Sequence, residues 1–397
     1  MSQHDMNLDN QAGAAFRADL NSALGALVTL SSGASAPAVT YANMLWADTF
    51  TGFLKQRDNS NTAWISVYPL SGIQNILDPY LFAKADKSSS AFTKTGNGTA
   101  SIKAGTILKV AQQVFSFTSN TAITMPTLTS GTDYAIYICS DGTVRADSNF
   151  TAPTGYTTLN SLRIGSFHYA PGGNATGTSG GNTTPQINEN SFWDLKFKPA
   201  CQDPRGMTLV AGSFCSDIYL LGQEHLSNGT SKYNVTIADG SSPPKVPTQF
   251  GGNGTSSYSD LNYCNAGEVM RSYGKRLPRY DEFAALAYGT TEASSVGTDQ
   301  VSTILNSAYT SQCGVIQATG VMWIWGADFG GGAAASSWSA NTGGRGSTYQ
   351  MSNAVLFGSH WNEGANSGSR ASFWNYSPTN SLSHIGARGV CDLLILD

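Results

Sequence analysis

The sequence predicts a β-rich, multidomain protein, and three of its features lead to this expectation. At 397 residues the chain is longer than one hydrophobic core usually serves, so two or three domains are expected. Only 12% of the residues are charged and 43 are glycines, a composition typical of short strands joined by turns. Between residues 82 and 170, runs of alternating apolar and polar residues recur about every ten residues. We therefore expect an N-terminal helical/β module, then a β-sandwich, and then a C-terminal α+β part.

The expected N-terminal module covers residues 1–81 and begins with a helix. In the segment 11–28, four apolar residues follow one another at steps of four and three: Phe16, Leu20, Ala23 and Leu27. This spacing places one apolar stripe along a helix. So narrow a stripe suits either self-association of the helix or packing on its own domain, and the residues alone leave both open. Short strands are expected to follow, between residues 40 and 70.

The expected β-sandwich covers residues 82–170. Its clearest local signal is the Asp141-Gly142 pair, which lies between two alternating runs and predicts a tight hairpin. The following segment, 171–186, is rich in Gly, Asn and Thr and has no periodicity. We interpret it as a linker between two domains.

The last expected domain covers residues 187–397 and contains two helices. The first is predicted near residues 265–273, before Gly274, and the second from about residue 278 to residue 288. Arg279 stands where a capping Ser, Thr or Asn is usual, so Glu282 is expected to lack its usual capping partner. The second helix should still form, slightly weakened.

The charge and cysteine content exclude several classes of function. The net charge is −4 and no run of Lys or Arg occurs, so nucleic-acid binding is not expected. No stretch approaches the ~20 apolar residues of a membrane span, and no basic segment followed by an apolar run opens the chain. We expect a soluble protein made in a cytoplasm, without membrane insertion. The six cysteines lie far apart without metal-ligand spacing, so we expect no metal and no cofactor.

Motifs in the C-terminal half resemble those of a known family. The segment GKRLPRYDEFAALAYG at 274–289 resembles the signature of the formylglycine-generating-enzyme branch of the C-type lectin fold. Other motifs of that branch are present in the same order along the chain: WDLKFKPACQDPRGM at 193–207, WIWGADFGG at 323–331 and NTGGRGS at 341–347. Together with TSKYNVTIADGS at 230–241, GSRA at 368–371 and GARGV at 386–390, they resemble the phage major tropism determinants. The resemblance covers residues 82–397, whereas residues 1–80 look more like other phage tail-fibre proteins.

The resemblance implies a C-type-lectin-like domain with a variable segment at about 358–386, of the kind that a diversity-generating retroelement alters. The residues expected to bind a receptor are His360, Asn362, Glu363, Gly364, Asn366, Phe373, Asn375, Tyr376, Asn380, Leu382, His384 and Ile385. Those expected to form the scaffold of the site are Trp361, Arg370, Trp374, Gly386 and Arg388, with Gly368, Ser369, Ala371 and Pro378. Strand alternation is compatible with this division, because Phe373 and Asn375 project oppositely to Trp374.

By the same resemblance, the chain is expected to be a tail-fibre tip protein of the virion, synthesised in the host cytoplasm. It would be a homotrimer that adheres noncovalently and multivalently to a host bacterial surface receptor, a protein rather than a glycan. Its N-terminal module would attach to other phage tail proteins. The predicted surface mixes aromatic, aliphatic and amide side chains, which is the composition of a protein-binding patch.

Two enzymatic alternatives stay open from the sequence. A formylglycine-generating-type oxidase would need a redox-active cysteine pair, and the segment 358–386 has no cysteine. A tail-associated glycan depolymerase would need two carboxylates about 5–9 Å apart in a cleft. The carboxylates most easily nominated are Asp203, Asp239, Asp281 and Glu282. We do not expect His360 or His384 to be catalytic, because no nucleophile or carboxylate stands at a suggestive spacing.

Overall fold

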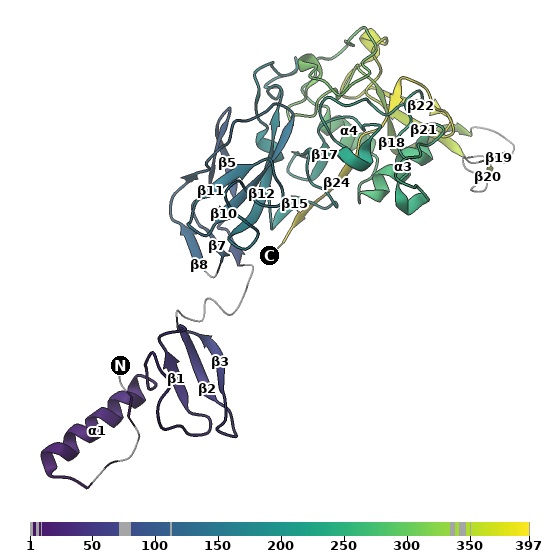
Figure 1. Cartoon of the computed structure of the whole chain (residues 1–397). Helices are drawn as coiled ribbons and strands as arrows, with labels where there is room; N and C mark the ends of the chain where they lie inside the picture. Colours follow the sequence, from purple (N-terminus) through teal and green to yellow (C-terminus); the bar gives the residue numbers. More distant parts are fainter. Residues whose placement is uncertain are drawn as a thin grey trace. The chain divides into compact units, whose positions relative to one another are not determined.

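The computed structural model describes residues 3–4, 8, 10–70, 81–111, 113–333, 338–340, 347–349 and 351–396. Contacts within the chain divide it into two compact units (Figure 1). The N-terminal unit comprises Met1–Leu81 with Gln112–Phe115, and the C-terminal unit comprises Phe82–Ala111 with Ser116–Asp397. Strands dominate both units, so the predicted β-rich, multidomain class is confirmed.

The N-terminal unit consists of one helix and a three-stranded antiparallel sheet of order β1-β2-β3. The elements are α1 (Gly13–Val28), β1 (Leu45–Asp48), β2 (Phe53–Arg57) and β3 (Trp64–Pro69). On one side of the sheet Trp46 and Trp64 meet edge to face, with ring centroids 5.3 Å apart. Asp48 holds the β1–β2 turn, because it pairs with Lys55 at 2.7 Å and accepts the amide of Phe50 at 3.0 Å. The last turns of α1 adjoin the sheet, whereas its first turns extend away from it (Figure 1).

The first part of the C-terminal unit is built mainly from strands, with a 3₁₀ turn at Glu189–Ser191. The strands are β4 (Phe82–Ala83), β5 (Phe92–Gly96), β6 (Thr99–Ile102), β7 (Thr106–Val110), β8 (Gln113–Phe117), β9 (Thr121–Ala122), β10 (Thr132–Cys139), β11 (Val144–Asp147), β12 (Ser161–Ala170), β13 (Gln186–Ile187) and β14 (Trp193–Asp194), and β8 is shared between the two units. The main sheet has the order β11-β10-β12-β13, and β14 also pairs with β12. The predicted hairpin joins β10 to β11, where Gly142 adopts a φ of +83° that favours glycine.

The segment 171–186 is ordered, which corrects the prediction of a linker. Its backbone is hydrogen-bonded to the later part of the unit: the amides of Ala175, Gly180 and Gly181 donate to the carbonyls of Ser311, Gly289 and Ser307 at 3.0, 2.9 and 2.8 Å. Glycine serves close packing in this segment rather than freedom, since a Cβ on Gly180 would lie 2.5 Å from the backbone of Ala308. Composition alone does not distinguish these two uses of glycine.

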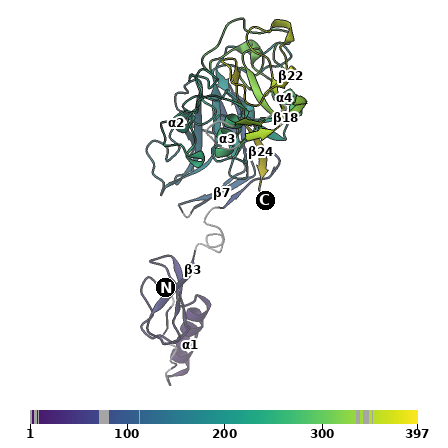
Figure 2. The same ribbon diagram turned by 90° about the vertical axis from the view of Figure 1, so that its right-hand side faces the viewer.

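The lectin-like part of the unit combines short helices with two four-stranded sheets and one two-stranded sheet. Its main elements are β15 (Phe197–Pro199), β16 (Met207–Val210), β17 (Phe214–Asp217), α2 (His225–Asn228), α3 (Tyr263–Ser272), α4 (Tyr280–Leu286), β18 (Trp323–Ala333), β19 (Trp338–Ala340), β20 (Ser347–Tyr349), β21 (Ser352–Phe357), β22 (Ser372–Tyr376), β23 (Ile385–Gly386) and β24 (Val390–Ile395). One four-stranded sheet has the order β15-β24-β17-β16 and the other β22-β21-β18-β23, and the two-stranded sheet is β19-β20. Figure 2 shows α4, β18 and β22 gathered at one side of this unit.

Both predicted helices form, and their ends follow local rules. Asn262 caps α3 by accepting the amide of Asn265 at 2.9 Å, and Gly274 follows the helix with a φ of +72°. At the start of α4 the Glu282 carboxylate still accepts the amide of Arg279 at 2.9 Å. Half of the capping box is therefore present. The other half is missing, because the guanidinium of Arg279 has no acceptor atom for the backbone amide of Glu282.

Candidate functional site

Strand β22 displays the predicted alternation of solvent-facing and core-facing side chains. Phe373 and Asn375 are exposed, whereas Trp374 between them is half-buried and packs against the main apolar core. The indole of Trp374 lies edge to face with Tyr280, at a centroid distance of 6.1 Å. A glycine faces it on β18, because a Cβ on Gly330 would come within 2.8 Å of the Trp374 ring. The strand therefore packs its inner side chain against the core and exposes its outer side chains to solvent.

Aromatic side chains connect β22 to the neighbouring strand β18. The ring of Phe373 lies 6.2 Å from that of Trp323 and 5.6 Å from that of Tyr376, and Tyr376 in turn lies 6.3 Å from Trp325. Phe373 keeps 43% of its surface exposed, and nearby on the chain Leu382 keeps 40%. Large apolar surfaces that are exposed yet fixed by buried neighbours are suited to bind another molecule.

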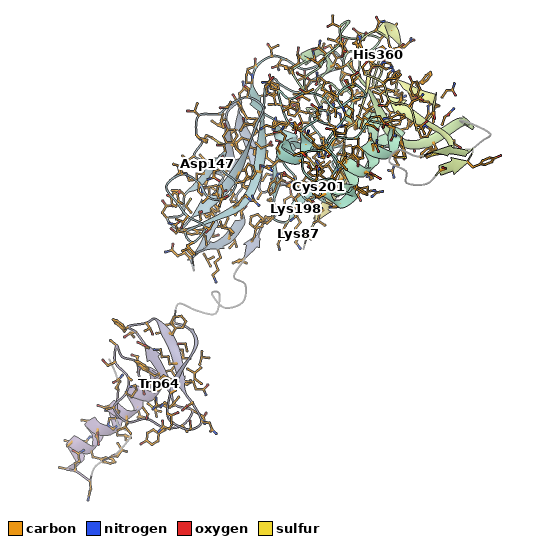
Figure 3. All side chains as sticks on the ribbon, turned by 45° about the vertical axis from the view of Figure 1, so that its right-hand side comes forward. Trp64, Lys87, Asp147, Lys198, Cys201 and His360 are labelled. Atoms are coloured by element: carbon orange, nitrogen blue, oxygen red, sulfur yellow. The ribbon has the colours of Figure 1, made fainter. Side chains whose placement is uncertain are left out.

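The two halves of the predicted site meet at a pair of histidines. His360 follows β21 and His384 precedes β23, and their ring centroids lie 4.6 Å apart. Trp361 contacts both rings, at 5.0 and 6.0 Å. The Nε2 atom of His360 is 3.2 Å from the carboxylate of Glu363, and Figure 3 labels His360 at the outer edge of the unit. Residues more than twenty positions apart thus form one continuous surface.

The environment of this pair keeps both imidazoles neutral near neutral pH. Burial lowers the pKa of His360, and the nearby carboxylate of Glu363 opposes this effect only in part. Burial and then repulsion from His360 lower the pKa of His384. Asp299 interacts electrostatically with both rings, and burial raises the pKa of its carboxyl.

Acidification is expected to destabilise the folded C-terminal unit through these two histidines. Their pKa values lie below the ordinary 6.5, so the unfolded chain binds more protons as the pH falls through that value. Stability is complete above it and declines below it, by less than about 1 kcal/mol because solvent screens both rings. The measurement is thermal unfolding between about pH 7 and pH 5. The double variant His360→Asn/His384→Asn should show a shallower pH dependence than the parent, and equal slopes would contradict the assignment.

The predicted asparagines occupy the surface around these rings. Asn362, Asn366 and Asn380 are exposed, and Asn366 donates to Glu363 at 3.3 Å. The side-chain oxygen of Asn375 accepts from Asn353 at 2.7 Å, which leaves its amide nitrogen for other partners. Asparagine offers both donors and acceptors, so these positions suit adaptable polar contacts.

One predicted binding residue, Ile385, is placed differently from the expectation, and a second, Gly364, can contribute only its backbone. Ile385 is completely buried, because it lies on β23 beside Trp323 of β18 and packs in the apolar cluster there. Its side chain is part of the core, which corrects its assignment to the binding surface. Gly364 has no side chain to offer, and its φ of +49° points to a role in the turn of the 3₁₀ segment Gly364–Asn366.

Main-chain hydrogen bonds hold the loop between β22 and β23. The carbonyl of Leu382 accepts the amide of Gly240 at 3.0 Å, and the carbonyl of His384 accepts the amide of Trp323 at 3.1 Å. At the other end of the loop, the carbonyl of Pro378 accepts the amide of Tyr263 at 3.1 Å. These contacts do not depend on which side chains the loop carries.

The residue Arg388 anchors the end of the site to the core. Its side chain has no exposed surface, and the guanidinium donates to the carbonyls of Asp217, Ile218, Ile316 and Gln317 at 2.7 to 3.1 Å. Burial lowers the pKa of Arg388 to about 9, although the carboxylate of Asp217 opposes the shift. The predicted scaffold role of Arg388 therefore agrees with its place in the structure.

The other predicted scaffold residues differ in how they contribute. Gly386 is required by packing, since a Cβ there would lie 2.6 Å from the sulfur of Met322. The backbone carbonyl of Trp361 accepts from Ser295 Oγ at 2.8 Å. The side chain of Arg370 is exposed, so only its backbone takes part, accepting from the hydroxyl of Tyr280 at 3.4 Å. The assignment of Arg370 to the scaffold therefore rests on its backbone and stays a prediction.

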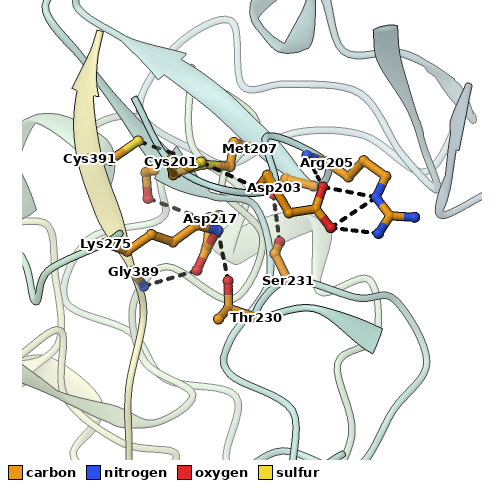
Figure 4. A network of polar contacts seen from close by, with 12 residues as sticks. Cys201, Asp203, Arg205, Met207, Asp217, Thr230, Ser231, Lys275, Gly389 and Cys391 are labelled. Atoms are coloured by element: carbon orange, nitrogen blue, oxygen red, sulfur yellow. Dashed lines mark hydrogen bonds and ion pairs between the residues drawn. The ribbon is translucent and has the colours of Figure 1, made fainter. Parts of the chain in front are cut away.

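A buried ion pair joins Lys275 to Asp217 (Figure 4). The carbonyl of Asp217 also accepts a hydrogen bond from Arg388 at 2.8 Å. The ammonium of Lys275 contacts Asp217 at 2.5 Å and donates to the hydroxyl of Thr230 at 2.7 Å. The second oxygen of Asp217 accepts the amide of Gly389 at 3.1 Å. Both charged side chains are at most 2% exposed, so the pair is removed from water and satisfied within the protein.

Sequence reasoning missed two residues of the surface. Asp299 interacts electrostatically with the histidine pair, and Phe329 of β18 is 40% exposed with its ring 4.8 Å from Tyr263. Asp299 lies some sixty positions before His360, and no local pattern connects the two. Phe329 belongs to the Trp- and Gly-rich strand, whose alternation indicated only that some of its residues would face outward.

The carboxylates nominated for glycan hydrolysis all have structural partners. Asp203 pairs with Arg205 at 2.5 Å, and Asp239 accepts the amides of Ser241 and Ser242. Asp281 pairs with Arg279 at 3.3 Å, and Glu282 pairs with Arg276 at 2.6 Å. All six cysteines are free thiols. In the described part of the chain, no three His, Cys, Asp or Glu side chains lie together as ligands for a metal ion. None of the helices among the described residues combines the length and apolarity that crossing a membrane requires.

Comparison with known proteins decides the family. The model of the second domain of Mtd matches residues 90–194. Over 325 residues, which are 80% of this chain and 85% of the relative, the sequence is 61% identical to the tail fiber receptor-binding protein of Bordetella phage BPP-1. The chain belongs to the major tropism determinant family. The resemblance stated from its motifs is thus confirmed.

Solved structures of the major tropism determinants share the fold. The I1 variant superimposes with a TM-score of 0.81 and 56% sequence identity, covering 90% of this chain and 96% of that one. The P3c variant gives the same TM-score at 55% identity and the same coverage. The relative in Bordetella phage BPP-1 is named as a receptor-binding protein of the tail fibre, so the comparisons favour receptor binding over either enzymatic alternative.

Proposed function

We propose that the chain adheres to a host bacterial surface receptor through one solvent-facing surface of its lectin-like part. We call this surface the receptor face; it comprises His360, Asn362, Glu363, Gly364, Asn366, Phe373, Asn375, Tyr376, Asn380, Leu382 and His384. The observation that carries the proposal is that these side chains are largely accessible while main-chain bonds and buried residues fix the backbone beneath them. The named activity of the relative in Bordetella phage BPP-1 supports it.

The composition of the receptor face favours a protein receptor. Phe373, Tyr376 and Leu382 supply apolar anchors, and the asparagines around them supply adaptable hydrogen bonds. Adhesion is noncovalent and needs no cofactor, metal ion or catalytic step. Several copies of the chain, a homotrimer in the simplest case, display the face together on the virion, which can raise the effective affinity by ~10²- to 10⁴-fold. The N-terminal unit attaches the protein to other tail proteins.

The triple variant Phe373→Ala/Tyr376→Ala/Leu382→Ala tests this proposal. Truncating the apolar anchors of a binding surface removes most of its affinity, so adsorption to host cells should fall by roughly 10²-fold or more. The matched control is Ile107→Ala/Leu159→Ala/Leu226→Ala, which truncates three exposed apolar residues elsewhere in the C-terminal unit. Unchanged adsorption by a triple variant with a parental circular dichroism spectrum would show that the receptor face is not the binding surface.

A further inference from the structure

Three cysteines and a methionine bring their sulfur atoms together beside the last strand of the chain. Cys391 lies on β24, Cys215 lies opposite it on β17, and Cys201 follows β15 on the other side of β24. The sulfur of Met207 is 3.4 Å from Sγ of Cys201 and 3.8 Å from Sγ of Cys391 (Figure 4). None of these four residues belongs to the receptor face.

The pairing of β15 with β24 places Cys201 opposite Cys391. The two strands are antiparallel, and just beyond β15 the amide of Ala200 donates to the carbonyl of Asp392 at 2.9 Å, which continues the register toward residues 201 and 391. The next pair along is of the kind without backbone hydrogen bonds, in which the Cα atoms are about 4.5 Å apart and the side chains are closest. Disulfides span Cα distances of about 4.4–6.8 Å, so Cys201 and Cys391 can be bridged without moving the backbone.

Cys215 is a less suitable partner for Cys391. The two face each other across β17 and β24, and two positions further along the amide of Asp217 donates to the carbonyl of Gly389 at 2.8 Å. Hydrogen-bonded pairs recur at every second position, so Cys215 and Cys391 form such a pair, with Cα atoms about 5.5 Å apart and side chains held further apart. The Cβ atoms of a disulfide lie only about 3.5–4.5 Å apart, which this pair does not match.

Of the well-placed pair, Cys201 is the thiol that solvent can reach. It is half-buried and lines a surface cavity of about 750 Å³, whereas its partner is only 3% exposed. Arg163 and Lys198 line the same cavity, and the carboxylate that lines it, Asp203, is paired with Arg205. The cavity therefore carries a net positive charge, and a small anionic reagent that enters it meets Cys201 first.

We propose that Cys201 and Cys391 form a reversible disulfide when the protein meets an anionic small-molecule disulfide such as oxidised glutathione. The Cys201 thiolate attacks one sulfur of the small disulfide, which gives a mixed disulfide and releases one small thiol. The Cys391 thiolate then attacks the Cys201 sulfur and releases the second small thiol. The protons of the two protein thiols pass to the released thiols, and the small disulfide takes up the two electrons that the protein loses.

This bond adds a covalent lock to the scaffold and thereby goes beyond receptor binding. It closes a loop from residue 201 to residue 391, which contains most of the lectin-like part, and cross-linking so long a loop strongly restricts the unfolded chain. Thiols stay reduced in a cytoplasm, whereas disulfides persist outside cells. The bond thus stabilises the protein after it leaves the cell in which it was made, without drawing on any side chain of the receptor face.

Counting thiols tests the bond in the full-length chain with Cys264→Ala, which removes the exposed cysteine. Hydrogen bonding to Cys391 and burial raise the pKa of Cys201, so the exchange with oxidised glutathione is run at about pH 8.5, where more thiolate is present. Alkylation after denaturation and mass spectrometry should show the loss of two thiols and a linked peptide pair containing residues 201 and 391. An unchanged number of thiols, a lasting glutathione adduct on Cys201, or a link between Cys391 and Cys215 would overturn the proposal.

Two variants in the same background separate the pair from its neighbour. Cys215→Ala should still lose two thiols to one internal bond, whereas Cys201→Ala should form no internal bond although Cys215 and Cys391 remain. Oxidation should raise the thermal transition of the C-terminal unit by roughly 5–10 °C in the Cys264→Ala chain, and dithiothreitol should reverse the shift. In Cys201→Ala the transition should be the same before and after exposure to oxidised glutathione. A bond that formed without raising the transition would contradict its role as a lock on the scaffold.

Discussion

Replacing Arg388 by methionine should lower the free energy of unfolding of the C-terminal unit by about 3–5 kcal/mol. The guanidinium supplies hydrogen bonds to four buried carbonyl groups, those of Asp217, Ile218, Ile316 and Gln317. A methionine fills much of the volume but removes all four hydrogen bonds. The carbonyl of Ile218 keeps the amide of Ile316 as a donor and that of Asp217 keeps the hydroxyl of Ser216, so the loss falls mainly on the carbonyls of Ile316 and Gln317. An unsatisfied buried polar group costs about 1–3 kcal/mol. Urea-induced unfolding followed by tryptophan fluorescence measures the loss.

Two further variants identify the cause of this loss. Arg388→Lys keeps the charge but not the planar fork, so it should recover only part of the stability. Arg370→Met makes the same change at an exposed side chain near the receptor face and should alter stability by no more than about 0.5 kcal/mol. Full recovery by Arg388→Lys would show that charge, and not the set of four hydrogen bonds, is what the site requires.

Replacing Asp217 by asparagine should have an effect of similar size, about 3–5 kcal/mol. The variant leaves the ammonium of Lys275 buried without its counter-charge, and the exposed fraction of the Lys275 side chain is only 2%. It also weakens the acceptor for the amide of Gly389, which lies directly after Arg388. The same urea titration measures the change, and the midpoint should fall without a change in slope.

The exposed pair between Arg276 and Asp392 provides the comparison. Its atoms lie 2.8 Å apart, yet the carboxylate of Asp392 is 79% exposed, so Asp392→Asn should cost less than about 1 kcal/mol. The double variant Asp217→Leu/Lys275→Met removes both buried charges together and should be more stable than Asp217→Asn. If the double variant were the less stable of the two, the ion pair itself, and not the stranded charge, would be the source of stability.

The sequence predicted those elements whose signals are local. Gly142, Gly274 and Asn262 act within a few residues of their own position, and the hairpin and the α3 ends form as their chemistry requires. The segment 171–186 was misjudged because its glycines serve contacts with residues more than a hundred positions away. No local pattern distinguishes a glycine that allows motion from one that allows close packing.

The site was predicted through family motifs, and physics supported only part of it. The alternation along β22 correctly separated Trp374 from its exposed neighbours. Ile385 was misassigned because two residues of β23 lie beside β18 in a parallel arrangement, which a segment this short does not signal. Asp299 was missed because it reaches the histidine pair through the tertiary fold alone. The positions of the motifs in the sequence indicated where the surface lies. The burial of each side chain in the structure shows which of its residues are accessible to another molecule.

The main-chain bonds of the loop after β22 carry a consequence for how this surface can change. The amide of Asn380 donates to Ser377, and the amide of Ile385 donates to Leu382 within the same loop. Every amino acid except proline supplies that N–H group, so these main-chain hydrogen bonds form whichever other residues the loop contains. At Asn380 proline is therefore the one replacement expected to break the loop instead of altering its chemistry. Substitutions at residue 380 that exclude proline would therefore change which molecules the surface binds, and nearly all of the resulting variants would still fold.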